Sequence, residues 1–218
     1  MTRGKRDSAD TATQILDVAE QLVQVRGFNA VSYADVAAEL KVTTAALHYH
    51  FAGKAELGEA LMARYTSRFA EALASVESRV VDAFERLVAY AGLYLDVLQK
   101  KRMCLCGMLA AEYQTLPPPM QDTVVRFFAE NEAWLARVLE EGREQGTLQF
   151  DESPSDVARM IVSSLEGAML VARSFGDVKR FQGVADQVLA GLKPTTHRPG
   201  RTSDRSKASA KAALSGST

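Results

Sequence analysis

The stretch from residue 32 to residue 54, SYADVAAELKVTTAALHYHFAGK, constrains the fold of this chain more than any other. Ser32 and Thr43 can each cap a short helix that follows, and Gly53 precedes a long helical pattern that starts at Lys54. The stretch therefore predicts a short helix, a tight turn, a second short helix and the start of a third. This order is typical of helix-turn-helix proteins that read DNA.

The second short helix is expected to have an inner and an outer face. Leu47 and Phe51 anchor the inner face, which leaves hydroxyl, methyl, imidazole and phenol groups outside. Such groups suit phosphate oxygens, thymine methyls and base edges. Lys54 would lie at a helix N-terminus, where its ammonium and backbone N–H groups could grip one phosphate. The expected DNA-binding residues are Ser32, Tyr33, Thr43, Thr44, Ala45, His48, Tyr49, His50 and Lys54, with a structural role open for His48 and His50.

Helix start and stop signals along the chain predict an all-α fold of about nine helices. The first helix is expected from Thr11 to Arg26, after a mobile basic arm at residues 1–9. Residues 193–218 carry six basic residues against one acid and show no apolar periodicity, which predicts a disordered tail. The other helices are expected at about 54–78, 80–100, 118–145, 154–175 and 178–192, with a mostly apolar segment at 104–116.

Composition narrows the classes of function. The chain has 218 residues and a formal net charge of −1, so any basic surface for nucleic acid must be local. Its apolar runs are far shorter than a membrane span and no secretory signal is visible, which favours the cytoplasm. We expect no metal site, cofactor or enzymatic activity, because ligand spacing, a phosphate loop and a nucleophile–base pair are not evident. Glu112 and Glu166 are lone acids that suit polar contacts or hydrogen bonds to a ligand.

Residues 12–57 carry three spaced motifs: ILDVAEQLVQVRGF, S-x-x-D-V-A, and V-T-x-x-x-L-x-Y-H-F-x-x-K-x-x-L from Val42 to Leu57. Together they closely resemble the N-terminal domain of TetR-family transcriptional regulators. Two positions depart from the family pattern: Lys41 stands where the family often has glycine, and His48 where it usually has an aromatic residue. Glycine permits a left-handed backbone, so either Lys41 is slightly strained or the turn differs.

The resemblance implies a helix-turn-helix domain at residues 1–54, a helical ligand-binding and dimerisation domain at 55–192, and a basic tail at 193–218. It implies a homodimer on double-stranded DNA at a palindromic operator, released by a small-molecule effector and therefore most simply a repressor. In the family the last two helices of each subunit form a four-helix interface. An activator, or a DNA-binding protein without a ligand, remains open.

The segment MCLCGMLAAEY and its neighbours gather thiols, thioethers and aromatic rings, which suit an adaptable small-molecule site but also an ordinary core. Its C-x-x-G-x-L-A-A-E pattern resembles a TetR subgroup in which some members sense electrophiles or oxidants through a cysteine. The basic residues 100–102 could lower the pKa of Cys104 or Cys106, whereas buried, inert thiols are the alternative. The candidate ligand-binding residues are Tyr90, Tyr94, Cys104, Met108, Tyr113, Phe127, Phe128, Trp134 and Met169.

Overall fold

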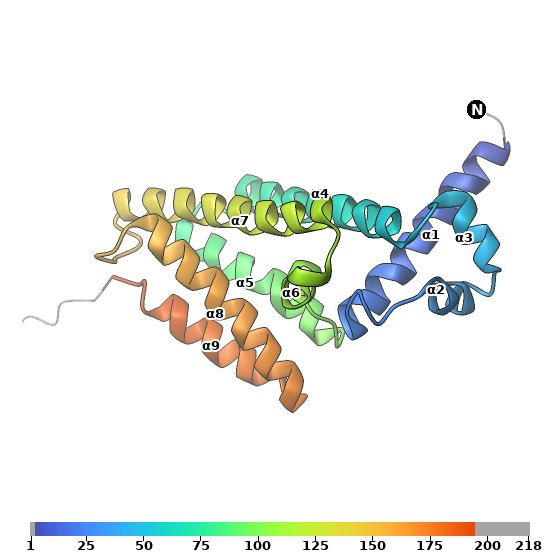
Figure 1. Cartoon of the computed structure of the whole chain (residues 1–218). Helices are drawn as coiled ribbons and strands as arrows, with labels where there is room; N and C mark the ends of the chain where they lie inside the picture. The colour runs from blue at the N-terminus through green and yellow to red at the C-terminus, as the bar shows by residue number, and fades with distance from the viewer. Residues whose placement is uncertain (1–2, 195–218) are drawn as a thin grey trace, which may run out of the picture.

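The computed structural model of the chain describes residues 3–194, which form nine α-helices and one short 3₁₀ helix and contain no strand (Figure 1). The all-α prediction is thus confirmed. The elements are α1 (Arg3–Arg26), α2 (Tyr33–Leu40), α3 (Thr44–His50), α4 (Lys54–Arg79), α5 (Ala83–Gln99), α6 (Leu105–Ala111), η1 (Tyr113–Thr115), α7 (Pro118–Glu144), α8 (Pro154–Phe175) and α9 (Val178–Ala190).

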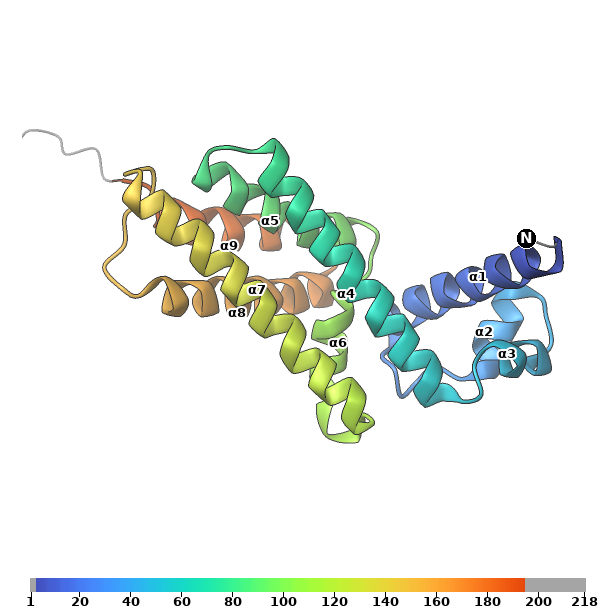
Figure 2. The same cartoon turned by 90° about the horizontal axis from the view of Figure 1, so that it is seen from above.

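The helices form two parts that share one long helix. In both views α1, α2 and α3 gather at one end, and α4 runs from them into a larger helical body (Figures 1 and 2). There α4 packs against α5 and α7, while α8 and α9 lie together on the side of the body away from α4. No helix among the described residues is long and apolar enough to cross a membrane.

Local side-chain bonds explain where the first helices begin and end. The backbone N–H of Ser32 donates to Asp35 Oδ2 at 2.8 Å, and the N–H of Asp35 donates back to Ser32 Oγ at 3.3 Å, which completes a capping box. Thr43 Oγ1 accepts from the N–H of Ala46 at 3.3 Å. Gly27 ends α1 with a φ of +88°, a conformation that favours glycine. The predicted helix signals are therefore confirmed at these three positions.

Three boundaries differ from the prediction. The basic N-terminal arm is not separate from the first helix, because α1 already begins at Arg3. This expectation was wrong, and the reason is that no proline interrupts the chain between Arg3 and Thr11. The next helix of the body starts at Ala83 rather than residue 80, because Asp82 accepts from the N–H of Glu85 and caps it there. The mostly apolar segment at 104–116 forms two elements, α6 and η1, which are separated at Glu112. Residues 195–218 of the predicted tail lie outside the described residues.

Candidate functional site

The short helix α3 presents one face to solvent. Leu47 is fully buried and Phe51, which follows the helix, is also buried. Thr44, Ala45 and Tyr49 lie on the opposite face, where Tyr49 is 80% exposed. Because Leu47 and Phe51 anchor α3, the exposed side chain of Tyr49 is available to contact another molecule.

The turn between α2 and α3 is tight and left-handed. Lys41 has φ 56° and ψ 41°, and its backbone N–H donates to Ala38 O at 3.2 Å. Val42 N–H donates to Ala37 O at 3.0 Å and completes the turn. Of the two possibilities left open by the sequence, the structure therefore supports a left-handed turn with a slightly strained lysine, at a cost of about 1 kcal/mol.

Two of the predicted DNA-binding side chains hold α3 in place. The Tyr33 hydroxyl donates to the carbonyl oxygen of Phe51 at 2.9 Å. The ring of His48 lies 4.6 Å from that of Tyr33, and its Nδ1 is 3.2 Å from the carbonyl oxygen of Ala52. These contacts fix the orientation of α3, whereas half-buried His50 packs its ring edge-on to Tyr49 at 5.1 Å.

Lys54, at the first position of α4, is also engaged within the chain. Its Nζ donates to Asn29 O at 3.2 Å and lies 4.7 Å above the ring of Phe28. Burial lowers the pKa of the Lys54 ammonium. Since an ammonium has three donors, the bond to Asn29 leaves capacity for one further acceptor or more.

The turn after α1 is bonded to the far end of α6. The Glu112 carboxylate accepts from the backbone N–H of Phe28 at 2.7 Å and from that of Asn29 at 3.2 Å. The Asn29 amide donates to Thr115 Oγ1 at 2.6 Å. The carboxylate expected to make polar contacts thus joins the helix-turn-helix part to the helical body.

A second connection between the two parts is ionic. Glu20 on α1 is only 5% exposed and pairs with Arg64 Nη2 at 2.9 Å and with Arg68 Nη2 at 3.2 Å, both on α4. Arg64 also pairs with Asp17 at 2.8 Å. Because a buried acid is costly without its partners, this group fixes α1 on the middle of α4.

The interior of the body contains six aromatic residues that we call the aromatic cluster. Phe69 lies at its centre, with ring centroids 5.1 Å from Phe127, 6.1 Å from Tyr94 and 6.2 Å from Tyr90. Trp134 stacks on Tyr90 at 5.7 Å with an interplanar angle of 19°. The members are Tyr65, Phe69, Tyr90, Tyr94, Phe127 and Trp134, from α4, α5 and α7.

Polar atoms are buried within the aromatic cluster. The hydroxyls of Tyr90 and Tyr94 lie 3.0 Å apart, and Tyr90 also donates to Asn131 Oδ1 at 3.2 Å. The Nε1 of Trp134 and the Oε1 of Glu166 are buried without a hydrogen-bond partner. Buried polar groups are normally paired, so a ligand could supply a missing hydrogen bond to either of these two atoms.

The structure brings together five of the nine predicted ligand-binding residues. Tyr90, Tyr94, Phe127 and Trp134 belong to the aromatic cluster, and Cys104 joins it because the Tyr65 hydroxyl donates to Cys104 Sγ at 3.6 Å. The other four lie around it: Phe128 stacks edge-on to Phe127, Met169 is fully buried, and Met108 and Tyr113 are half-buried on α6 and η1.

The sequence reasoning missed three members of this interior. Tyr65 and Phe69 stand four residues apart on the apolar stripe of α4, a spacing that places both on one face. Asn131 lies between Phe127 and Trp134 on the buried stripe of α7, where an amide is out of place unless it has a specific partner. That signal was visible in the sequence.

The two thiols lack the features of a reactive site. Cys104 and Cys106 are both free and buried. Burial raises the pKa of each thiol well above its usual value, and the nearby Glu166 carboxylate raises it further. The basic residues 100–102 do not offset this: Lys100 and Lys101 are exposed, and Arg102 donates to Gln24. The alternative of buried, inert thiols is therefore favoured over a thiol sensor.

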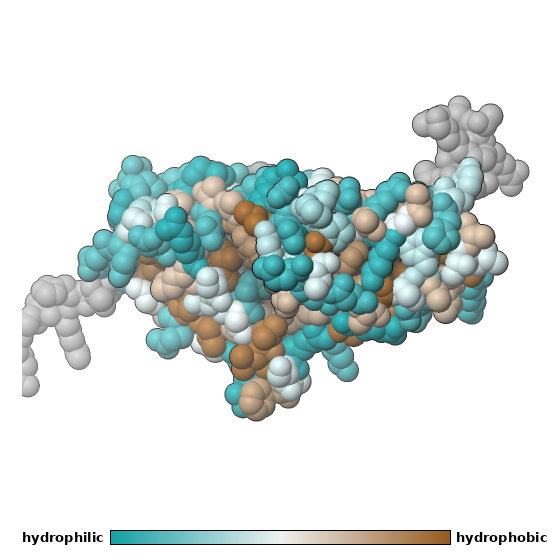
Figure 3. All heavy atoms as spheres, viewed as in Figure 1, coloured by the Kyte–Doolittle hydropathy of each residue, from teal (hydrophilic) through white to brown (hydrophobic). Residues whose placement is uncertain are grey.

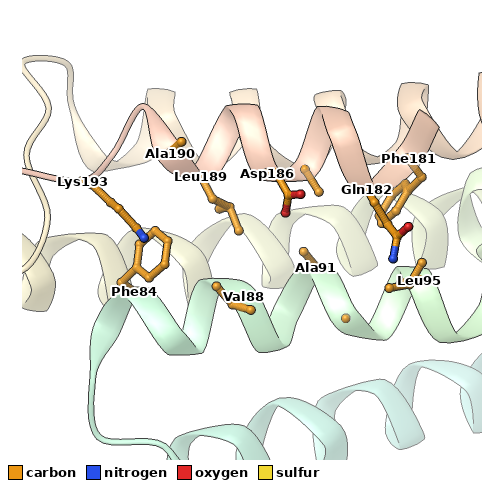
Figure 4. Close-up of a pocket in the computed structure, with 12 residues that line it drawn as sticks. Phe84, Val88, Ala91, Leu95, Phe181, Gln182, Asp186, Leu189, Ala190 and Lys193 are labelled. Carbon is orange, nitrogen blue, oxygen red and sulfur yellow. The ribbon is translucent and has the colours of Figure 1, made fainter. Parts of the chain in front are cut away.

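The larger grooves that the structure describes lie away from the predicted ligand residues. One of about 670 Å³ runs between α5 and α9, where Lys193 Nζ lies 4.2 Å above the ring of Phe84 (Figure 4). Another, of about 700 Å³, lies between α9 and the segment that joins α7 to α8. Neither is lined by any of the nine candidates, which are in the packed interior and beside it.

The paired helices α8 and α9 leave an apolar surface uncovered. Figure 3 shows hydrophobic residues gathered over these helices. No side chain lies within 4 Å of where a Cβ on Gly167 or Gly183 would stand, so this face could admit another helix closely. The buried residues of α8 face the interior of the chain instead, among them Ile161, Leu165, Ala168, Met169 and Ala172. The exposed apolar residues are Met160, Leu170, Val171, Phe175 and Val184.

Comparison with known proteins identifies both parts of this architecture. Bacterial regulatory proteins of the tetR family match residues 15–61, and the tetracyclin repressor-like C-terminal domain matches residues 83–188. The HTH-type transcriptional repressor NemR of Escherichia coli K12 is 28% identical over 181 residues, which cover 78% of this chain and 89% of NemR.

Solved structures agree with these matches. A TetR-family regulator from Agrobacterium tumefaciens is 30% identical with a TM-score of 0.83, over 86% of this chain and 100% of the other. A TetR regulator from Legionella pneumophila is 33% identical with a TM-score of 0.76, over 83% and 96%. The members of this family are transcriptional regulators that bind DNA and small-molecule effectors and act as dimers. On its helix-turn-helix, its helical body and these matches along the chain, the protein belongs to the TetR family.

Proposed function

We propose that this protein is an effector-responsive repressor that binds a palindromic operator as a homodimer. The observation that carries the proposal is the exposed face of α3, on which Tyr49 stands 80% exposed while Leu47 is fully buried. A helix that reads the major groove needs one face packed on its own domain and the opposite face exposed to the DNA. The relative NemR is described as a repressor, which favours repression over activation. We also propose that the protein acts in the cytoplasm, as expected for a repressor of this family.

The predicted DNA-binding residues fall into three roles. Thr44, Ala45 and Tyr49 reach base edges from the exposed face of α3. Tyr33 and His48 position α3 through the contacts with Phe51 and Ala52. The remaining four, Ser32, Thr43, His50 and Lys54, lie at helix ends, where they contact phosphates.

The apolar surface of α8 and α9 forms the dimer interface. A second copy related by a two-fold axis would cover Leu170, Val171 and Phe175 and remove their apolar area from water. Two readers related in this way demand two half-sites in opposite orientation, about one helical turn or somewhat more apart.

The aromatic cluster is the effector site, and its construction explains how the effector acts. Tyr90 and Trp134 are almost completely buried, so an effector must move helices apart to enter. Tyr65 and Phe69 belong to the cluster and to α4, whose first turn adjoins α3. Displacement of α4 would change the distance between the two readers of a dimer. The effector must bind the DNA-free conformation more tightly than the DNA-bound one, because only a difference in affinity can shift the equilibrium between them.

A gel-shift experiment with the purified dimer and the DNA upstream of its own gene tests the proposal. We expect specific retardation at a fixed, stated salt concentration, because phosphate contacts make the affinity salt-dependent. A mutated palindrome of the same length is the control. Equal retardation of both fragments, or of neither, would contradict a specific operator-binding repressor.

A further inference from the structure

Glu166 on α8 is a carboxylate without a cation. Its Oε1 is buried and has no hydrogen-bond partner. Its Oε2 faces Gly107 so closely that a Cβ there would lie 2.2 Å away. No ion pair found among residues 3–194 includes Glu166. The two arginines of α8 that lie seven residues away from it bond elsewhere. Arg159 pairs with Asp156 and Glu132, and Arg173 donates to the Val25 carbonyl oxygen and the Met108 sulfur.

The carboxylate stands beside the aromatic cluster. Glu166 Oε2 lies beside Gly107, whose backbone N–H approaches Cys104 Sγ at 3.5 Å. Cys104 Sγ also accepts from the Tyr65 hydroxyl at 3.6 Å, so Gly107 and Cys104 connect the acid to the cluster. Burial is the main cause that raises the pKa values of the Tyr90 and Tyr94 hydroxyls, and the charge of Glu166 raises both further. One acid and several electron-rich rings therefore border the same interior.

We infer that the effector of this protein is a small organic cation, an amine in its protonated form or a quaternary ammonium, held by Glu166 and the aromatic cluster. This inference rests on the proposed function, because it names the class of molecule that the effector site takes. An ammonium supplies the missing partner of Oε1, and aromatic faces attract a cation by their quadrupole. An anion would be repelled by the ionised form of Glu166, and a neutral apolar molecule would leave Oε1 without a partner.

The side chains of the site also dictate the shape of the ligand. The ring faces that surround a cation must lie within about 6 Å of it, which limits the cationic head to a few carbon atoms. The unpartnered Nε1 of Trp134 is a donor, so an acceptor such as a hydroxyl or ether oxygen elsewhere in the ligand would satisfy it. A compact ammonium with one oxygen nearby meets both requirements.

Direct binding can be followed on the free protein, without DNA. Trp134 is the only tryptophan of the chain and belongs to the aromatic cluster, so its fluorescence reports on the site. The probes are choline, tetramethylammonium and butylammonium, and the matched neutral ligand is 3,3-dimethylbutan-1-ol, which has the shape of choline without its charge. We expect saturable fluorescence changes with at least one cation and an affinity for the neutral alcohol at least tenfold weaker than for choline.

Two variants locate the binding. Glu166→Gln keeps the shape of the side chain and should weaken cation binding at least tenfold, whereas Glu130→Gln removes an exposed acid of α7 and should leave it unchanged. The comparison of choline with the neutral alcohol uses the natural protein, so the test stands even if Glu166→Gln does not fold. Equal affinity for choline and the alcohol, no response to any of the three cations, or full affinity in a folded Glu166→Gln would each overturn the inference.

Failure of this inference and failure of the proposed function give different results. If the dimer retards its operator but no cation perturbs Trp134, the effector class is wrong and the repressor stands. If cations bind through Glu166 while no specific DNA fragment is retarded, the cation site stands and the repressor proposal fails.

Discussion

The Glu112 carboxylate accepts a hydrogen bond from the backbone N–H of Phe28 at 2.7 Å. The two residues lie in different parts of the molecule, one after α6 and one after α1. The same carboxylate approaches Gly27, where a Cβ would lie 2.5 Å from Oε1, so a side chain at that position would displace it. Since the N-terminal cap of α6 is Cys104, beside Glu166, this one short helix touches the proposed effector site at one end and the helix-turn-helix part at the other.

Replacing Glu112 should weaken this connection. We expect Glu112→Ala to lower the free energy of unfolding by about 1–2 kcal/mol, because two backbone N–H groups lose a charged acceptor. Urea unfolding measures the change, and effector-driven release from the operator should require more effector. Glu39→Ala, an exposed acid on α2, is the control. A variant with unchanged stability and unchanged release would show that the bond has no role.

Tyr49→Ala tests the reading face of α3. Loss of one good base contact costs about 1–3 kcal/mol, so we expect operator affinity to fall about tenfold or more. The unfolding temperature should stay the same because the side chain is 80% exposed. Fluorescence anisotropy at fixed salt measures the affinity, with Val81→Ala, 87% exposed and remote from α3, as the control. Undiminished affinity would place the reading surface elsewhere.

Leu170→Glu tests the surface of α8 and α9. Leu170 is 52% exposed in the single chain, and a carboxylate there would be buried without a partner in a dimer. We expect sedimentation to show monomers that keep their helical content but bind the operator weakly. Val81→Glu introduces the same charge between α4 and α5 and should remain dimeric. A dimeric Leu170→Glu protein would exclude this face as the interface.

The buried thiols should react slowly. Because burial and Glu166 raise the pKa of Cys104 and Cys106, the native protein holds little thiolate at neutral pH. We expect slow colour formation with Ellman's reagent, and reaction of both cysteines once guanidinium unfolds the chain. The exposed variant Ser78→Cys should react at once and serves as the reference. Fast labelling of the native protein would restore the thiol-sensor alternative.

The raised pKa of Glu166 predicts a pH dependence of stability. Burial is the main cause that raises this pKa from 4.5 to about 7, so the folded protein holds its proton more tightly than the unfolded chain does. The contribution of protonated Glu166 to the free energy of unfolding is therefore fully present below about pH 4.5 and is lost as the pH rises through about 7.

Glu166→Gln cannot lose a proton and should escape this loss. Its unfolding temperature should exceed that of the natural protein at about pH 8, with a smaller difference at about pH 5. Differential scanning fluorimetry across this range measures the trend. A constant difference across the range, or a trend shared by Glu130→Gln, would be incompatible with titration of Glu166.

Much of the fold could be predicted because it is encoded locally. Ser32 caps α2 through Asp35, three residues away, and Gly27 ends α1 by its own backbone conformation. The inner face of α3 followed in the same way from the spacing of Leu47 and Phe51. The start of α1 differs from the prediction because the basic residues near Arg3 do not stop a helix.

The proposed effector site could be predicted only in outline, because it depends on contacts between distant residues. Aromatic residues of α5 and α7 were identified, but nothing in their spacing shows that Phe69 of α4 lies between them. The same holds for Lys54, whose bond to Asn29 spans 25 residues, and for Glu166, whose unpartnered Oε1 is a property of the folded interior.

In the proposed mechanism, the length of α4 determines what kind of motion can release the DNA. Its 26 residues form one uninterrupted rod of about 39 Å, with Lys54 at one end and Tyr65 about 16 Å along it. A rod transmits a tilt and amplifies it with distance, so a rotation of a few degrees beside Tyr65 becomes a shift of an ångström or more at its first turn. Nothing in α3 has to unfold for this to occur. Hydrogen exchange should therefore find the backbone of α3 equally protected with and without effector, because regulation changes the angle of an intact reader.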